Sequence, residues 1–464
     1  MQITETMSEG LRREYKVVIG REDLDAKLNG KIEEMRPRMH LKGFRPGKAP
    51  VSFLKKSFGK SVMGEIVEEA VNESSQKTLT DNALKPAFPP RVELGSDMDQ
   101  VAEGKSDLEF VLKIDLMPEF EVMDASRLNV DKLLSEVTDN DVQDAMERIA
   151  EQSRSYSPRD AGEPAEKSDS TIIDFVGRVD GEEFAGGKAE DFNLILGSGQ
   201  FVPGFEDQLV GAKVGNSRDV TVTFPADYPE AKLAGKEAVF AVTVKEVRKP
   251  DPLMIDDELA KRIGADSLAS LKERVREQLK QDFSRASRMH LKRRILDALD
   301  SAHSFPLPEA MVQTEFDAIW RAVEAELQRE GKTVASEGKT EEELKKEYYD
   351  IAERRVRLGL VLARIGEQNG IQVAPDEVNR AAAARARQYA IQSRMDPSGD
   401  AVTEQQAFQM LVNNPQAMAE IRAPLFEDKV VDFIAELAQV NERRVDRETL
   451  FMDPDEAAEK LAQR

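Results

Sequence analysis

The chain has 464 residues, 40% of them hydrophobic and 33% charged, and a formal net charge of −22. This length suits about three domains of ~100–200 residues each, and the acidity argues against broad binding to nucleic acids or membranes, which are themselves anionic. Cysteine is absent, which excludes disulfides and thiol chemistry. Because no apolar run approaches the ~20 residues of a membrane span, and no signal peptide stands at the start, we expect a cytoplasmic protein.

Residues 1 to about 115 predict a small α+β domain. Leu11–Ile19 and Leu108–Leu116 alternate like strands, and we expect them to pair. Helices are expected over Glu22–Met35 and Val51–Asp81. In the second helix one apolar stripe is predicted from residues at helical spacing: Phe53, Leu54, Phe58, Val62, Ile66 and Val67.

The segment Met35–Lys60, which runs from the end of the first helix into the start of the second, reverses the charge of the chain, with eight basic side chains and no acid. Its centre, Gly43-Phe44-Arg45-Pro46-Gly47-Lys48-Ala49-Pro50, disfavours helix because proline lacks a donor and glycine permits positive φ. Phe44 and Arg45 are therefore expected at the tip of a tight loop, where an aromatic and an arginine are typical of a binding hot spot. The alternative is a merely solvated basic surface, but the absence of acids and the turn residues favour binding to an anionic partner.

Residues 116–150 predict a connector. It contains an extended stretch at Leu128–Leu134 and a helix over Asp139–Gln152, which Thr138 or Asp139 would cap.

Residues 151–248 change character, because glycine and aromatic residues rise and strands replace helices. The expected elements are strands at Thr171–Val179, Phe192–Leu196, Arg218–Phe224 and Glu237–Val247, and a short helix at Phe205–Val210. This segment contains neither cysteine nor histidine, which disfavours nucleophile-and-base catalysis and zinc sites, and we expect neither a metal nor a cofactor.

One reaction needs no such group, namely rotation about an X–Pro bond, whose barrier comes from amide resonance at ~18–20 kcal/mol for an ordinary peptide bond. An apolar pocket walled by aromatic rings can desolvate the amide and favour its twisted, less dipolar state. The alternative is that the aromatic residues are only the core of a small β domain, which composition alone favours by roughly two to one.

The segment resembles the FKBP-type prolyl isomerases. The resemblance rests on Ile172–Gly177, Asp180–Phe184, Phe192–Gly197 and Phe201–Glu206. It implies an antiparallel β-sheet with a short helix, and a proline pocket lined by eight residues: Phe175, Phe184, Phe192, Phe201, Val202, Phe205, Tyr228 and Phe240.

From Asp251 to the end the pattern predicts helices. One helix is expected over Leu268–Leu279, one from about Pro308 to Arg329, and one over Glu341–Gln368. Further helices are expected to begin at Pro375 and near Pro415. Lys332–Lys339 and Asp396–Gly399 are expected to be exposed turns. The helices are predicted either as an ordinary bundle or as a cradle with dispersed exposed apolar residues, such as Met410, Leu411 and Met418, that hold unfolded chains.

The whole chain is similar to the trigger factor family of bacterial ribosome-associated chaperones. The family motif Gly-Phe-Arg-x-Gly-x-x-Pro is matched at Gly43, Phe44, Arg45, Gly47 and Pro50, and an FKBP-like segment and a helical half follow. The resemblance implies that the loop docks on a large-subunit ribosomal protein and adjoining rRNA at the exit of the peptide tunnel. The implied contact residues are Gly43, Phe44, Arg45, Pro46, Gly47, Lys48 and Pro50, with Pro46 standing where many members have lysine.

We therefore expect a multidomain α+β protein. Its parts are an α+β ribosome-binding domain (1–115), the connector (116–150), an FKBP-like isomerase domain (151–248) and an all-α chaperone domain (249–464). Its expected partners are the ribosome, nascent and unfolded polypeptides, and a second copy of the chain off the ribosome, but no membrane. Two alternatives are a stand-alone FKBP-type prolyl isomerase with flanking substrate-capture domains, and a non-enzymatic assembly chaperone.

Overall fold

The computed structural model describes most of the chain. The described residues are 1–37, 44, 48–160, 162–225, 228, 230, 232–329, 331, 332, 334, 338, 340–395 and 401–462. They form two compact units, one from residues 1–130, 294–327 and 333–439, the other from 131–293, 328–332 and 440–464.

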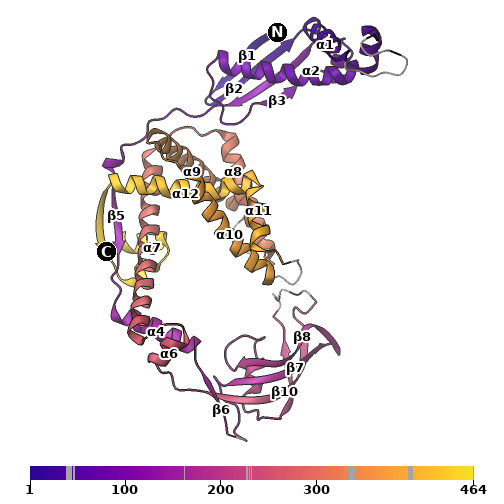
Figure 1. The fold of residues 1–464 in the computed structure, drawn as a ribbon. Helices are drawn as coiled ribbons and strands as arrows, with labels where there is room; N and C mark the ends of the chain where they lie inside the picture. The colour runs from indigo at the N-terminus through magenta and orange to yellow at the C-terminus, as the bar shows by residue number, and fades with distance from the viewer. Residues whose placement is uncertain are drawn as a thin grey trace. The chain divides into compact units, whose positions relative to one another are not determined.

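The first unit begins with a four-stranded antiparallel sheet in the order β1-β2-β4-β3 (Figure 1). Its elements are β1 (Gln2–Glu9), β2 (Arg12–Ile19), α1 (Arg21–Met35), α2 (Val51–Asp81), β3 (Arg91–Leu94), α3 (Met98–Ala102) and β4 (Leu108–Asp115). The predicted pairing is confirmed, with Val17 of β2 opposite Phe110 of β4. Both helices agree with their predicted ranges. The edge strands β1 and β3 were not expected, because almost every residue in them is exposed and no apolar alternation marks them.

The core of this sheet lies between the strands and the two helices. Leu24, Leu28 and Ile32 recur every four residues on α1 and are all buried against it. On α2 the predicted stripe is confirmed at Leu54, Val62, Ile66 and Val67. The prediction is wrong for Phe53, which is 43% exposed, because it lies one position off the buried face, about 100° around the helix. Phe58 is only partly buried.

The second unit contains a five-stranded antiparallel sheet in which β10 pairs with β6, β7 and β9, and β7 pairs with β8. Its elements are β6 (Tyr156–Pro158), β7 (Ser170–Val179), β8 (Glu182–Ile195), α5 (Phe205–Leu209), β9 (Ser217–Thr223) and β10 (Glu237–Pro250). The four predicted strands and the short helix are all present. However, β8 begins ten residues before the predicted Phe192, after a two-residue turn in which Asp180 and Gly181 both have positive φ (53° and 88°).

The connector folds as predicted but has a partner from the far end of the chain. It forms η1 (Ala125–Arg127), β5 (Asn129–Leu134) and α4 (Asp139–Gln152), and Thr138 caps α4 in a reciprocal pair with Asp141. β5 forms a two-stranded sheet with β11 (Gln439–Arg444). The prediction of helix to the end of the chain is therefore wrong at β11, a mostly polar segment whose strand form depends on a partner some 300 residues away.

The remaining elements are helices. They are α6 (Asp257–Arg262), α7 (Leu268–Ala302), α8 (Glu309–Arg329), α9 (Glu341–Gln368), α10 (Pro375–Met395), α11 (Glu404–Val412), α12 (Pro415–Leu437), α13 (Arg447–Phe451) and α14 (Pro454–Ala462). In the first unit, α10, α11 and α12 share a core around Val378, Ala382 and Ile421. The turns expected at Lys332–Lys339 and Asp396–Gly399 fall mostly or wholly outside the described residues. None of the helices described here is long and apolar enough to cross a bilayer.

Candidate functional site

The aromatic residues of the second unit's sheet come together at one place. We call the aromatic cradle the eight residues predicted to line a pocket: Phe175, Phe184, Phe192, Phe201, Val202, Phe205, Tyr228 and Phe240. They come from β7, β8, the turn before α5, α5 itself, the loop after β9, and β10. The ring centroids of Phe201 and Phe205 lie 4.4 Å apart, and those of Phe205 and Phe240 lie 5.2 Å apart.

Burial divides the cradle into a floor and a rim. Phe175, Phe205 and Phe240 are at most 5% exposed and belong to the core of the domain. The other five members are only partly buried and pack on that core: Phe184, Phe192, Phe201, Val202 and Tyr228. The floor therefore belongs to the core of the domain, and the rim is a partly exposed apolar surface.

An eighth ring supports the rim and was not among the predicted site residues. Phe224 is 3% exposed, and its ring lies 4.6 Å from Tyr228 and 5.9 Å from Phe184. The sequence could have indicated this role, because Phe224 is the last residue of the predicted strand Arg218–Phe224.

Two glycines leave the space in which the rim rings lie. A Cβ at Gly177 would stand 2.5 Å from Phe240 Cε1 and 3.0 Å from Phe184 Cε1. One at Gly187 would stand 3.0 Å from two atoms of the Phe184 ring. The 2.5 Å contact is shorter than real Cβ atoms show, so Gly177 must be glycine if the Phe240 ring is to keep its place. The contacts at Gly187 are tight, so a Cβ there would push on the Phe184 ring, whose edge-to-face contact with Phe240 spans 5.9 Å.

Glu206, at the start of α5, fixes the turn that carries Phe201 and Val202. Its carboxylate accepts hydrogen bonds from the backbone N–H groups of Gly197 (2.7 Å), Gly199 (3.1 Å) and Phe201 (3.3 Å), and from the Ser198 hydroxyl (3.2 Å). Burial raises the pKa of Glu206, but these donors outweigh it and hold the pKa below its ordinary value. Sequence reasoning missed this positioning role, because a glutamate in the first turn of a helix is common on its own.

The cradle can therefore offer a ligand apolar, aromatic contact and little else. Tyr228 is its only member with a polar side-chain group. Such a surface can cover an apolar ring and remove water from an adjoining amide, but it supplies no acid-base pair.

The N-terminal loop is described only in part. Gly43, Arg45, Pro46 and Gly47 lie outside the described residues. Phe44 is partly buried against the N-terminal core, and its ring lies 5.1 Å from that of Phe53. The exposed Phe53 and the loop phenylalanine thus form one apolar pair.

The flanks of the loop can also be placed. Lys48 is exposed, and Pro50 is the N-cap residue of α2. Among the basic side chains of this segment that the structure describes, Lys55 pairs with Asp25 (2.9 Å) and Lys60 with Asp99 (2.6 Å), so both are neutralised within the domain.

The helices of the first unit expose some of the apolar residues that were expected to hold unfolded chains. Met410 is 60% exposed, whereas Leu411 and Met418 pack partly against the core of α10 and α12. On α10, Tyr389 and Ile391 are each 51% exposed. Dispersed apolar surface is therefore present on these helices.

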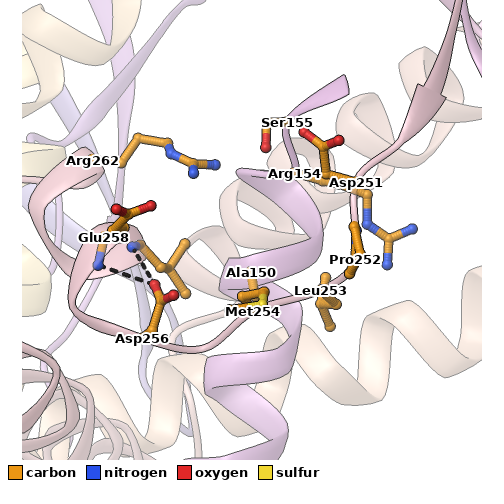
Figure 2. Close-up of a pocket in the computed structure, with 11 residues that line it drawn as sticks. Ala150, Arg154, Ser155, Asp251, Pro252, Leu253, Met254, Asp256, Glu258 and Arg262 are labelled. Carbon is orange, nitrogen blue, oxygen red and sulfur yellow. Dashed lines mark hydrogen bonds between the residues drawn. The ribbon is translucent and has the colours of Figure 1, made fainter. Parts of the chain in front are cut away.

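A hollow of about 210 Å³ lies where the chain passes from β10 to α6 (Figure 2). Its polar side chains are mostly engaged in holding the fold. Asp256 accepts from the backbone N–H groups of Glu258 and Leu259 at 3.0 Å each, and Arg262 donates to the carbonyl of Ser153 at 2.6 Å. The polar groups of this hollow therefore point to a structural junction rather than to a catalytic site.

Three family models match the chain in succession. They are the bacterial trigger factor protein over residues 1–149, the FKBP-type peptidyl-prolyl cis-trans isomerase over 161–245, and the C-terminus of the bacterial trigger factor protein over 267–436.

Curated relatives and a solved structure agree with these models. Trigger factor of Parvibaculum lavamentivorans is 51% identical over 98% of this chain and 87% of its own length. Trigger factor of Methylorubrum extorquens (strain PA1) is 49% identical over 98% of this chain and 94% of its own length. A solved structure of a trigger factor chaperone covers 94% of this chain and 99% of its own, with a TM-score of 0.55 at 20% identity, so it supports the multidomain fold. The chain belongs to the trigger factor family and contains an FKBP-type peptidyl-prolyl isomerase domain.

Proposed function

We propose that this chaperone docks at the tunnel exit of the ribosome through Gly43–Pro50 and speeds prolyl isomerisation in emerging chains through the aromatic cradle. The family membership and the FKBP-type domain support both halves. The observation that carries the catalytic half is the division of the cradle into a buried aromatic floor and a partly exposed rim. A proline ring seated there would have its amide desolvated, which lowers the energy of the twisted transition state relative to the more dipolar planar amide.

The docking half rests on the composition of the loop and on the one ring that can be placed. The Phe44 ring packs against Phe53 in the free protein, so it is already positioned before a partner binds. Lys48 is exposed beside it, and Arg45 would supply bonds to a carboxylate or phosphate. Family resemblance alone supports the finer partners, which are a large-subunit ribosomal protein with adjoining rRNA and, off the ribosome, a second copy of the chain.

The domain limits belong to the same proposal. Residues 1–115 would bind the ribosome, 116–150 connect, 151–248 isomerise and 249–464 hold unfolded chains, in the cytoplasm. Exposed apolar side chains on α10 and α11, such as Ile391 and Met410, suit weak contact with many sequences.

One experiment with two variants separates the two activities. Replacing Phe44 and Arg45 together by alanine should remove the protein from the ribosomal pellet at low salt, while isomerisation of a free proline peptide stays unchanged. Tyr228→Ala should do the reverse and lower kcat/KM about tenfold, the equivalent of one aromatic contact. Tyr389→Ala is the matched control, because it removes an exposed tyrosine from α10 and should alter neither result.

The contrary outcomes are equally distinct. Wild-type protein that stays in the supernatant at low salt would refute docking. An isomerisation rate unchanged by Tyr228→Ala would mean that the rim is only the edge of the core.

A further inference from the structure

A hollow of about 450 Å³ lies between β5 and α7 and shares no residue with the aromatic cradle. This volume falls within the ~300–1,000 Å³ of small-molecule sites. Its apolar wall is formed by Leu134, Val137 and Phe283, and two of its polar members are Lys132 and Ser287.

Two elements far apart in sequence bring these groups together. Lys132 and Leu134 are two residues apart on β5 and so share one face of the strand. Phe283 and Ser287 are four residues apart on α7 and so share one face of the helix. The hollow therefore combines an apolar wall with one hydroxyl and one ammonium group.

The hydroxyl of Ser287 lacks a partner although it is inside the protein. The residue is 3% exposed, and no described group accepts from or donates to its Oγ. A serine within a helix commonly donates to the carbonyl four residues earlier, and leaving a buried hydroxyl unpaired costs stability. This cost is removed if a polar ligand atom enters the hollow.

Lys132 is the second polar group without a partner. It is partly buried, and no ion pair joins it to an acid anywhere in the described ranges. The other charges at the hollow are neutralised, because Lys280 lies 3.6 Å from Glu277, and Glu136 lies 3.1 Å from Arg444. The lining of the hollow thus includes one uncompensated positive charge and one unpaired hydroxyl.

We propose that this hollow binds a small amphiphilic carboxylate, an organic acid with an apolar body. The body lies on Leu134, Val137 and Phe283, and the carboxylate accepts from the Lys132 ammonium and the Ser287 hydroxyl. Two unpartnered polar side chains match one acidic head group, whereas an extended peptide would bring a row of amides that these two side chains cannot satisfy. This binding is separate from ribosome docking and isomerisation and rests on neither.

Calorimetric titration of the full chain with octanoate, kept below the concentration at which it forms micelles, tests the head group. Octanoate should bind once per chain, octanol at least about tenfold more weakly, and octylamine not measurably, because only the carboxylate meets both groups. Equal binding of octanol and octanoate would overturn the proposal, since an apolar patch alone would then account for it.

Variants locate the site. Ser287→Ala and Lys132→Met should each weaken octanoate binding about tenfold, and Ser287→Ala should raise the Tm of the ligand-free protein because it removes the unpaired hydroxyl. Ser301→Ala is the control, since it removes an exposed and paired hydroxyl from the same helix outside the hollow, and should neither weaken octanoate binding nor raise the Tm. Octanoate affinity unchanged in both site variants would overturn the assignment. So would a peptide with a free apolar C-terminus that binds more tightly than octanoate and competes with it.

Discussion

Glu206 shows at the scale of a single residue how a polar group can shape an apolar site. Its buried carboxylate collects four hydrogen bonds from the turn that carries Phe201. Because Gly197 and Gly199 are exposed, their N–H groups would otherwise bond only to water, and the turn would lose its link to α5. The rim of the aromatic cradle is therefore held by a side chain that need not touch a substrate.

Replacing Glu206 by glutamine should loosen this turn without removing a ring. We expect a cost of about 2 kcal/mol, the loss of charge-assisted hydrogen bonds at a buried acceptor. Amide hydrogen exchange at Gly199 and Phe201 should become faster, and isomerase kcat/KM should fall. Asp207→Asn, which changes the exposed neighbouring carboxylate, is the control and should leave exchange unchanged. Equal rates of amide hydrogen exchange in wild type and Glu206→Gln would show that the turn keeps its structure without the Glu206 carboxylate.

The same residue predicts a dependence on pH. Because the pKa of Glu206 is lowered on folding from an ordinary value of 4.5, its contribution is complete above that pH. The contribution is lost as the pH falls from about 4.5 through the lowered folded pKa. The stability difference between wild type and Glu206→Gln should therefore shrink across this acid range and stay constant above it.

Much of the site could be predicted from residue types, but its division into floor and rim could not. All eight predicted residues of the cradle come together, because aromatic side chains on neighbouring strands of one small sheet have few other places to pack. Which rings are buried depends on the spaces left by Gly177 and Gly187, and these appear only once the strands are in register.

At the scale of elements, local signals predicted the helices well and the strands less completely. α9 has its predicted bounds, since Thr340 begins it with a capping box and Asn369 and Gly370 follow its end. β1 and β11 escaped prediction, because exposed polar strands exist only through hydrogen bonds to partners that the local sequence does not contain. The start of β8 was missed because Gly186 and Gly187 interrupt its alternation.

Two glycines of α9 provide a matched test of helix packing. A Cβ on Gly366 would meet the Phe426 ring of α12, with Cε2 at 2.8 Å, whereas one on the exposed Gly359 meets nothing within 4 Å. Gly366→Ala should therefore separate the helices and cost about 1–3 kcal/mol. Gly359→Ala should stabilise by roughly 0.5–1 kcal/mol, because alanine favours helix. Urea unfolding followed by circular dichroism measures both, and equal effects of the two exchanges would contradict the close packing at Gly366.

At the scale of the whole molecule, the last residues return to complete a core begun by the connector. The yellow strand β11 pairs with β5 (Figure 1). Leu450 and Leu461 are buried with Leu133 and Phe283. His290 is also buried there, and its Nε2 lies 2.9 Å from the carbonyl oxygen of Leu450. No local sequence pattern predicts that these segments pack together, since β5 and β11 are separated by most of the chain.

This closure predicts that one buried leucine near the end of the chain controls the stability of distant segments. Leu450→Ala, at a residue with no exposed surface, should cost about 2–5 kcal/mol through lost burial and the cavity left behind. Hydrogen exchange should rise in peptides covering β5 and residues 280–290, while β7 stays protected, because it belongs to a separate core. Phe451→Ala is the neighbouring control: it is 49% exposed, touches Phe283 only edge to face at 5.1 Å, and should cost about 1 kcal/mol. If both exchanges had the same small effect, the returning segment would be an appendage rather than part of the core.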